Sequence, residues 1–264
     1  CNWLQGLEGG IDSVHINFLH RNFSGSQNGA MDRARARSLA ATVEVAPTDY
    51  GYTYAGIREI SDDEGNYVRS YHFIAPFYQL RPNQLGKAQG KASGHMWVPI
   101  DDETTLVWNF SYRFDGEPLS ESERAQIGTG NEFGKDIVVE NGFQSKASAG
   151  NDYFIDRAVQ KTETFSGIPG TNTQDRAVQD TMGPICDRTK EHLGTTDRAI
   201  IMARKILMEA VKTVEDGGIP PGLGTNVYSL RPIEKVLPTG TAWQSALAGE
   251  LYDGVPYTTE YVPA

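Results

Sequence analysis

The stretch that decides the fold begins with Thr42-Val43-Glu44-Val45 and Tyr50-Gly51-Tyr52-Thr53-Tyr54 and continues to about residue 114. Three further runs of this kind follow, namely Val68 to Ile74, Met96-Trp97-Val98 and Thr105-Leu106-Val107-Trp108-Asn109-Phe110. β-Branched and aromatic residues suit the pleated surface of a sheet, and polar segments such as Asp62-Asp63-Glu64-Gly65-Asn66 predict turns. We therefore expect consecutive antiparallel strands in this region.

A helix is predicted on the N-terminal side of the strands, from Trp3 to His20. The apolar residues at helical spacing are Leu4, Leu7, Ile11, Val14 and Phe18. Gly9 and Gly10 each cost a helix about 1 kcal/mol, so we expect a bend there. Residues 21–38 are polar and rich in glycine and serine, which predicts a loop.

A longer helix is predicted after the strands. Thr195-Thr196-Asp197 is expected to cap it, and Gly217-Gly218 to end it. Its apolar stripe consists of Ala199, Ile200, Ala203, Ile206, Leu207, Ala210 and Val211. Strands followed by a long helix favour the α+β class, with a curved antiparallel sheet around a long C-terminal helix. We expect residues 1–264 to form a single domain.

Composition excludes several classes of protein. The 264 residues carry a net charge of −10, which argues against non-specific binding to nucleic acid or to an anionic membrane. No run of 18 apolar residues occurs, so a membrane span is not expected. Two cysteines, Cys1 and Cys186, are too few for a disulfide framework or an iron–sulfur cluster, and they suit a reducing cytoplasm.

The chemistry is indicated by Asp12-Ser13-Val14-His15-Ile16-Asn17-Phe18-Leu19-His20. On an ideal helix the two histidines lie about 140° apart, so they can share a metal only if the helix bends or unwinds near His20. Two imidazoles from one segment and a carboxylate from elsewhere make the facial triad of non-haem Fe(II). Asp12 is then suited to accept an imidazole N–H rather than to bind the metal.

Spacing alone leaves two alternatives open at this site. His15 and His20 could be ordinary, partly buried histidines of a helix. Zinc is the competing metal, although the His-Glu-x2-His pattern of many zinc enzymes is absent.

Three stretches bear on this choice. They are Asn2-Trp3-Leu4-Gln5 with Glu8-Gly9-Gly10-Ile11-Asp12; Gly170 to Gln179 with Met182-Gly183-Pro184 and Asp187-Arg188; and Glu191-His192-Leu193-Gly194 to Asp197-Arg198. Together with the two histidines, they resemble the catalytic domain of Rieske non-haem iron aromatic-ring-hydroxylating oxygenase α-subunits. The phthalate and phenoxybenzoate dioxygenase branch is the most similar.

The resemblance implies that His15, His20 and Asp175 bind one Fe(II), with Asp180 as the second choice for the carboxylate. It assigns to Asp12 the link between the iron and the Rieske cluster of a neighbouring subunit. It further implies the helix-grip fold and a homotrimer or a multiple of it.

One departure from the family concerns electron supply. The Cys-x-His and Cys-x2-His ligands of a Rieske [2Fe–2S] cluster are absent from this sequence. Because Cys1 is not an initiator residue, we expect a Rieske domain upstream in a longer protein; a separate subunit is the other source. A reductase or a ferredoxin would supply the electrons.

The function implied is that of an oxygenase which uses O2 to hydroxylate an aromatic ring or to cleave an aryl ether, on an aromatic carboxylate-like substrate. A helix-grip protein that binds a ligand without redox turnover is the alternative. An N-terminal hydrolase with Cys1 as its nucleophile is a third.

Four other residues are candidates for a role at the site. His72 and His95 lie in strand-like runs and are expected in the core or lining a pocket, whereas His192 is expected at the surface. Glu8 shares a helical face with Asp12, so it either supports the site or is a solvated charge.

Overall fold

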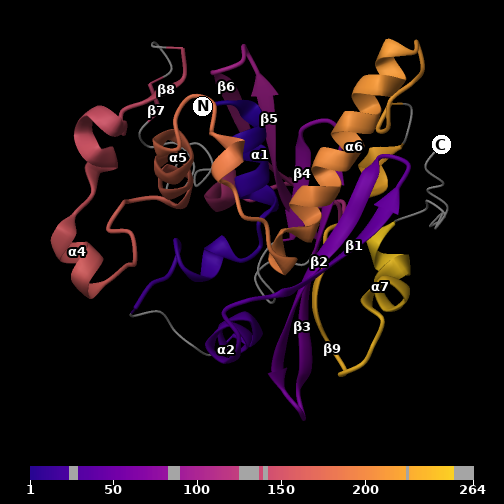
Figure 1. Cartoon of the computed structure of the whole chain (residues 1–264). Coiled ribbons are helices and arrows are strands. Elements are labelled where there is room, and N and C mark those ends of the chain that lie inside the picture. Colours follow the sequence, from indigo (N-terminus) through magenta and orange to yellow (C-terminus); the bar gives the residue numbers. More distant parts are fainter. Residues whose placement is uncertain (24–28, 83–89, 125–136, 139–141, 224–225, 253–264) are drawn as a thin grey trace.

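The computed structural model describes residues 1–23, 29–82, 90–124, 137–138, 142–223 and 226–252. Its centre is an antiparallel sheet in which consecutive strands are neighbours, so the predicted strands and the α+β class are confirmed (Figure 1). The strands are β1 (Thr42–Thr48), β2 (Gly51–Ser61), β3 (Gly65–Ile74), β4 (Tyr78–Pro82), β5 (Lys91–Pro99) and β6 (Thr105–Arg113), in this order. The short β9 (Glu234–Leu237) pairs with β3, and β7 (Ile137–Val138) pairs with β8 (Gln144–Ser145) separately.

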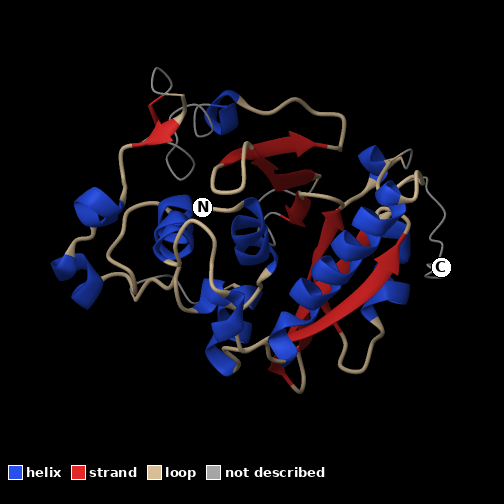
Figure 2. Ribbon diagram, turned by 45° about the horizontal axis from the view of Figure 1, so that its top comes forward, coloured by secondary structure: helices blue, strands red, loops and turns tan. Residues whose placement is uncertain are grey.

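Helices and 3₁₀ turns surround the sheet (Figure 2). They are α1 (Trp3–Ile11), η1 (His15–Asn17), α2 (Ala30–Arg37), η3 (Ala149–Phe154), α4 (Arg157–Thr162), α5 (Thr171–Thr181), η4 (Arg188–Lys190), η5 (Thr195–Asp197), α6 (Arg198–Glu215), η6 (Val227–Ser229) and α7 (Trp243–Leu251). In the part of the chain that the structure describes, none of them is both long and apolar enough to cross a membrane.

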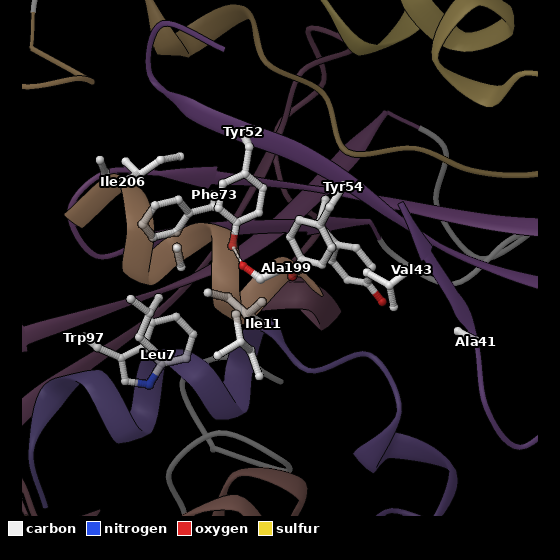
Figure 3. Packing of buried hydrophobic residues seen from close by; sticks show 14 residues of the cluster. Leu7, Ile11, Ala41, Val43, Tyr52, Tyr54, Phe73, Trp97, Ala199 and Ile206 are labelled. Atoms are coloured by element: carbon white, nitrogen blue, oxygen red, sulfur yellow. Dashed lines mark hydrogen bonds between the residues drawn. The ribbon is translucent and has the colours of Figure 1, made fainter. Parts of the chain in front are cut away.

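One face of the sheet is packed against α1 and α6 (Figure 3). Side chains alternate between the two faces of a strand, and the register pairs Tyr52 with Phe73 and Tyr54 with Tyr71, so these four rings share one face. The Tyr52 hydroxyl donates to the carbonyl of Ala199 in α6 at 2.7 Å. The residues that share this core are Leu7, Ile11, Ala41, Val43, Tyr52, Tyr54, Tyr71, Phe73, Ala75, Trp97, Ala199, Ile200, Ala203 and Ile206.

Helix α6 is the long helix that the periodicity predicted, but it is not the last element. Its buried residues, among them Ala203 and Ile206, belong to the predicted apolar stripe. Strand β9 and helix α7 follow it, and α7 inserts Trp243 and Leu247 into a second core on the opposite side of the sheet.

Helix α2 corrects the prediction that residues 21–38 form only a loop. Charged residues dominate its sequence, so no apolar period marks it. Ala34 is buried against Ile60 and Tyr67 of the sheet, and the partly buried Ala30 and Met31 of the same helix pack against this cluster.

Helix α1 is shorter than the predicted helix from Trp3 to His20. It runs through Gly9 and Gly10 and ends at Ile11. A Cβ added to Gly6 or Gly10 would lie 2.5 Å or 2.2 Å from the Trp97 ring of β5. The glycines therefore let α1 lie directly on the indole, which fixes the height of the helix above the sheet.

Candidate metal centre

The end of α1 delivers the histidine segment to the site. Asp12 follows the last helical residue with extended backbone angles, and its carboxylate accepts the N–H groups of Val14 at 2.8 Å and His15 at 3.1 Å. This side-chain turn competes successfully with the helix, as aspartate commonly does at such positions. His15 then begins a 3₁₀ turn, and His20 follows beyond it.

The unwinding brings the two imidazoles together, which an ideal helix would not do. The ring centroids of His15 and His20 are 5.0 Å apart, with the planes at 80°. Oδ1 of Asp175 in α5 lies 3.0 Å from Nε2 of His20 and 3.6 Å from Nε2 of His15. The three side chains thus offer ligand atoms that all lie within 4.8 Å of one another.

The remaining nitrogen of His20 is held by Gln174, a residue to which the sequence interpretation gave no role. Nδ1 of His20 lies 2.6 Å from the amide oxygen of Gln174, whose Nε2 donates to the carbonyl of Ile168 at 2.8 Å. Because that amide oxygen only accepts, the proton of a neutral imidazole resides on Nδ1, and Nε2 keeps a free lone pair toward Asp175.

The remaining nitrogen of His15 faces the carboxylate of Asp12. The Nδ1–Oδ2 distance is 3.6 Å, which is too long for a hydrogen bond but short enough for electrostatic attraction. Burial alone would lower the pKa of His15, but Asp12 and Asp175 outweigh it and raise that pKa. Burial alone would raise the pKa of Asp12, but His15 and the two backbone N–H groups outweigh burial and lower that pKa.

Helices α1 and α5 are joined so that Asp175 faces the histidines. Nε2 of Gln5 donates to the carbonyls of Gln179 and Gly183 at 3.4 and 3.1 Å, and its Oε1 accepts from the Cys186 N–H at 2.9 Å. One side chain of α1 therefore holds the C-terminal end of α5 and the loop that follows it.

The donor set fits a divalent metal ion. Two imidazole nitrogens and one carboxylate oxygen are the set of the non-haem Fe(II) facial triad. Ligands about 2.1 Å from a common ion and at right angles lie about 3.0 Å apart, which compares with the 3.0 and 3.6 Å observed to Asp175. Asp180 is not part of this group, and its carboxylate accepts from the Tyr153 hydroxyl at 3.3 Å.

The other candidate residues lie elsewhere. His72 is fully buried on the α7 side, where Nδ1 lies 2.7 Å from the Tyr50 hydroxyl and Nε2 lies 3.1 Å from the Arg231 carbonyl. His95 is buried and stacks on Trp97, and His192 is exposed.

Glu8 is neither a solvated charge nor a neighbour of the histidines. It is 8% exposed, and its carboxylate pairs with Arg204 at 2.6 Å and with Arg188. The role of Glu8 is therefore to join α1 to α6 and to the segment before it.

Comparison with known proteins gives the family. The family described as LigXa C-terminal domain like matches residues 1–260. The phthalate 4,5-dioxygenase oxygenase subunit of Pseudomonas putida is 32% identical over 99% of this chain and 58% of its own length. The 3-chlorobenzoate-3,4-dioxygenase oxygenase subunit of Comamonas testosteroni is 33% identical over 93% of this chain and 59% of its own.

A third relative, the 5,5'-dehydrodivanillate O-demethylase oxygenase subunit of a Sphingobium species, is 26% identical over 84% of this chain and 44% of its own length. The chain thus spans somewhat more than half the length of the first two relatives. It belongs to the LigXa C-terminal domain like family, and the predicted kinship with the catalytic domains of Rieske non-haem iron oxygenases is confirmed.

Proposed function

We propose that this chain binds one Fe(II) through Nε2 of His15, Nε2 of His20 and the carboxylate of Asp175. The observation that carries the proposal is the convergence of these three groups, two from the α1 end and one from α5. When bound, Fe(II) would supply the chemistry of dioxygen activation, which no side chain can supply.

The surrounding residues have separate tasks in this proposal. Gln174 fixes the tautomer and the ring orientation of His20. Asp12 fixes the turn before His15 and, with its side chain 26% exposed, forms the link from the Rieske cluster of a neighbouring subunit to His15.

The reaction we propose is O2-dependent hydroxylation of an aromatic ring or cleavage of an aryl ether, on an aromatic carboxylate-like substrate. The names of the relatives support this substrate class, because they refer to phthalate, 3-chlorobenzoate and the O-demethylation of 5,5'-dehydrodivanillate. The [2Fe–2S] cluster would belong to a domain or subunit outside this chain, with a reductase or ferredoxin as the electron donor.

The proposal extends to assembly and location. Residues 1–264 form one mononuclear-iron domain of the helix-grip type, in which α6 lies along the curved sheet. A homotrimer, or a multiple of it, is supported by the exposed apolar side chains of α6, namely Ile201, Met208, Val211 and Val214. The free cysteines, Cys1 and Cys186, suit a cytoplasmic protein.

Metal analysis of anaerobically prepared protein tests the ligand set. We expect Asp175→Ala to lose iron and Asp180→Ala to retain it, because only Asp175 lies beside the histidines. Asp12→Asn should retain iron, yet it should lose turnover in the complete enzyme. Iron retained by Asp175→Ala and lost by Asp180→Ala would transfer the ligand role to Asp180.

The same measurements distinguish the alternative functions. A helix-grip protein that only binds a ligand predicts no more than traces of iron, and no change in His15→Ala. An N-terminal hydrolase predicts hydrolysis that Cys1→Ala abolishes. Either result would contradict the oxygenase proposal.

A further inference from the structure

The turn at Asp12 takes from the carbonyl of Gly10 its helical partner. In a continuing α-helix this carbonyl would accept the N–H of Val14, four residues further along the chain. That N–H donates instead to Oδ1 of Asp12 at 2.8 Å. An unpaired carbonyl at a packed helix end is unfavourable, so the helix can end here only if another group supplies the hydrogen bond.

Gln79 of β4 supplies this hydrogen bond. Its Nε2 donates to the carbonyl of Gly10 at 2.5 Å and to the hydroxyl of Tyr54 at 2.5 Å, so both N–H groups of the amide are used. The side chain of Gln79 is buried, and so is Tyr54. Because a backbone carbonyl only accepts, the NH2 end of the amide must face Gly10, and the contact with Tyr54 holds it in that orientation.

The strand that carries Gln79 is itself fixed on both sides. β4 pairs with β3 and with β5, and Gln79 lies opposite Phe73 on one side and His95 on the other. Residues directly opposite each other in a sheet share a face, and Phe73 belongs to the face that α1 covers. A buried side chain of an inner strand has little freedom to move. The sheet therefore determines where the last turn of α1 lies.

Two other contacts hold the segment that follows the helix. Arg58 of β2 donates to the carbonyl of Ser13 at 2.8 Å, and Nδ2 of Asn17 donates to the carbonyl of Leu39, shortly before β1. Both of these contacts act on residues beyond the end of the helix. Gln79 differs from them because it acts on the last helical turn, where the chain either continues as a helix or leaves it.

We propose that Gln79 is a positioning residue of the metal centre, which caps Gly10 and thereby fixes the turn that presents His15 to the iron. The inference rests on the proposed function, in which His15 is a ligand. None of the three proposed ligands is a hydrogen-bond partner of Gln79 in the described part of the chain, so Gln79 acts through the backbone. Without this cap, the Gly10 carbonyl competes with Asp12 for the N–H of Val14, and the helix can extend toward His15.

Titration of the metal-free protein with Co(II) tests this role, because the visible d–d bands of bound Co(II) report the number and arrangement of its ligands. Gln79→Met is the first variant, since it keeps the length of the side chain and removes the donor. We expect its Co(II) spectrum to change and its dissociation constant for Co(II) to rise about 2- to 10-fold, the equivalent of one neutral hydrogen bond. Tyr54→Phe frees the amide to turn and should change the spectrum in the same direction, by a smaller amount.

Ser70→Ala is the matched control variant. Ser70 is another fully buried polar side chain of the sheet, and its hydroxyl donates to the carbonyl of Ile233 and accepts the N–H of the same residue, both at 2.8 Å. It lies opposite Ala55, whose side chain belongs to the core on the α7 side. Ser70→Ala should lower the free energy of unfolding and leave the Co(II) spectrum and affinity unchanged.

A double-mutant cycle isolates the cap from the space that the side chain fills. In Asp12→Ala the N–H of Val14 is free to bond the carbonyl of Gly10 again. Gln79→Met should therefore cost less free energy of unfolding in the Asp12→Ala background than alone. Equal costs in the two backgrounds would show that Gln79 only fills space, which would overturn the inference.

The Co(II) titrations give two further results that would overturn it. One is an unchanged spectrum in both Gln79→Met and Tyr54→Phe, and the other is the same spectral change in Ser70→Ala, which would indicate general loosening of the sheet. If Gln79→Met does not fold, Tyr54→Phe decides by the same criteria. Failure to bind Co(II) in the original protein would refute the proposed metal centre as well, whereas normal binding that is insensitive to both variants would refute the role of Gln79 alone.

Discussion

The contact between α1 and Trp97 predicts that Gly10→Ala destabilises the protein, although alanine is the better helix former. The new Cβ would lie 2.2 Å from Cη2 and 2.4 Å from Cζ2 of the indole, far inside van der Waals contact. Trp97 has little room to retreat, because it is 4% exposed and stacked on His95 at 5.2 Å. Such overpacking costs about 1–3 kcal/mol, against a gain of at most about 1 kcal/mol from helix propensity.

Gly249→Ala provides the matched control for this prediction. Gly249 lies in helix α7, and a Cβ added there meets no atom within 4 Å among the described residues. Because the propensity gain is common to both variants, their difference measures the clash alone. In urea unfolding followed by circular dichroism, we expect Gly10→Ala to be less stable than Gly249→Ala by about 1–3 kcal/mol.

A double-mutant cycle locates the cause. Trp97→Phe removes the part of the indole that the new Cβ would meet, so Gly10→Ala should cost less in the Trp97→Phe background than alone. Equal stabilisation by Gly10→Ala and Gly249→Ala, or no coupling to Trp97, would refute the view that this glycine sets the height of α1 and of the turn that carries His15.

Three further predictions follow from the hydrogen bonds and charges. Gln174→Leu leaves Nδ1 of His20 without its acceptor, so it should weaken iron binding about 10- to 100-fold in chelator competition. Gln174→Glu keeps an acceptor and should lose less affinity. Equal iron affinity in the original protein and both variants would contradict the role of Gln174. Glu8→Gln should lower the free energy of unfolding by about 2 kcal/mol, because it removes a carboxylate with a 10% exposed side chain from Arg188 and Arg204. Glu209→Gln, beside Lys205 at 3.8 Å on the surface of α6, should change it by less than about 0.5 kcal/mol. Burial lowers the pKa of His72 to about 4. Between about pH 6.5 and pH 4 the unfolded chain therefore takes up a proton at His72 that the folded protein does not, and the free energy of unfolding should fall by roughly 3 kcal/mol across this range. His72→Gln should flatten the pH dependence of unfolding in that window, and an unaltered slope would show that His72 is not the titrating group.

The sequence predicted the elements in which apolar residues follow the period of a strand or of a helix, because those apolar residues are the ones that the fold buries. The strands from Thr42 to Arg113 and helix α6 are of this kind. Helix α2 escaped prediction because half of its residues are charged, and the three apolar residues that pack on the sheet, Ala30, Met31 and Ala34, are too few to mark a helical stripe.

At the site, the sequence indicated which side chains could meet but not how. Because His15 and His20 lie on different sides of an ideal helix, the sequence required the helix to bend or unwind. The prediction placed this break near the glycines or near His20, but the helix ends at Ile11 and Asp12 caps it. Gln174 contacts His20 across 154 residues of sequence, so no local spacing could assign it.

The end of α1 at Ile11 has a consequence for ion selectivity. The peptide dipoles of a helix add up to about half a negative charge at its C-terminus, here directly before Asp12 and His15. This partial charge adds to those of Asp12 and Asp175 and favours a doubly positive ion over a singly charged or neutral occupant. A substitution that frays the last turn of α1 would therefore weaken cation binding by a small factor, without altering any group that touches the ion.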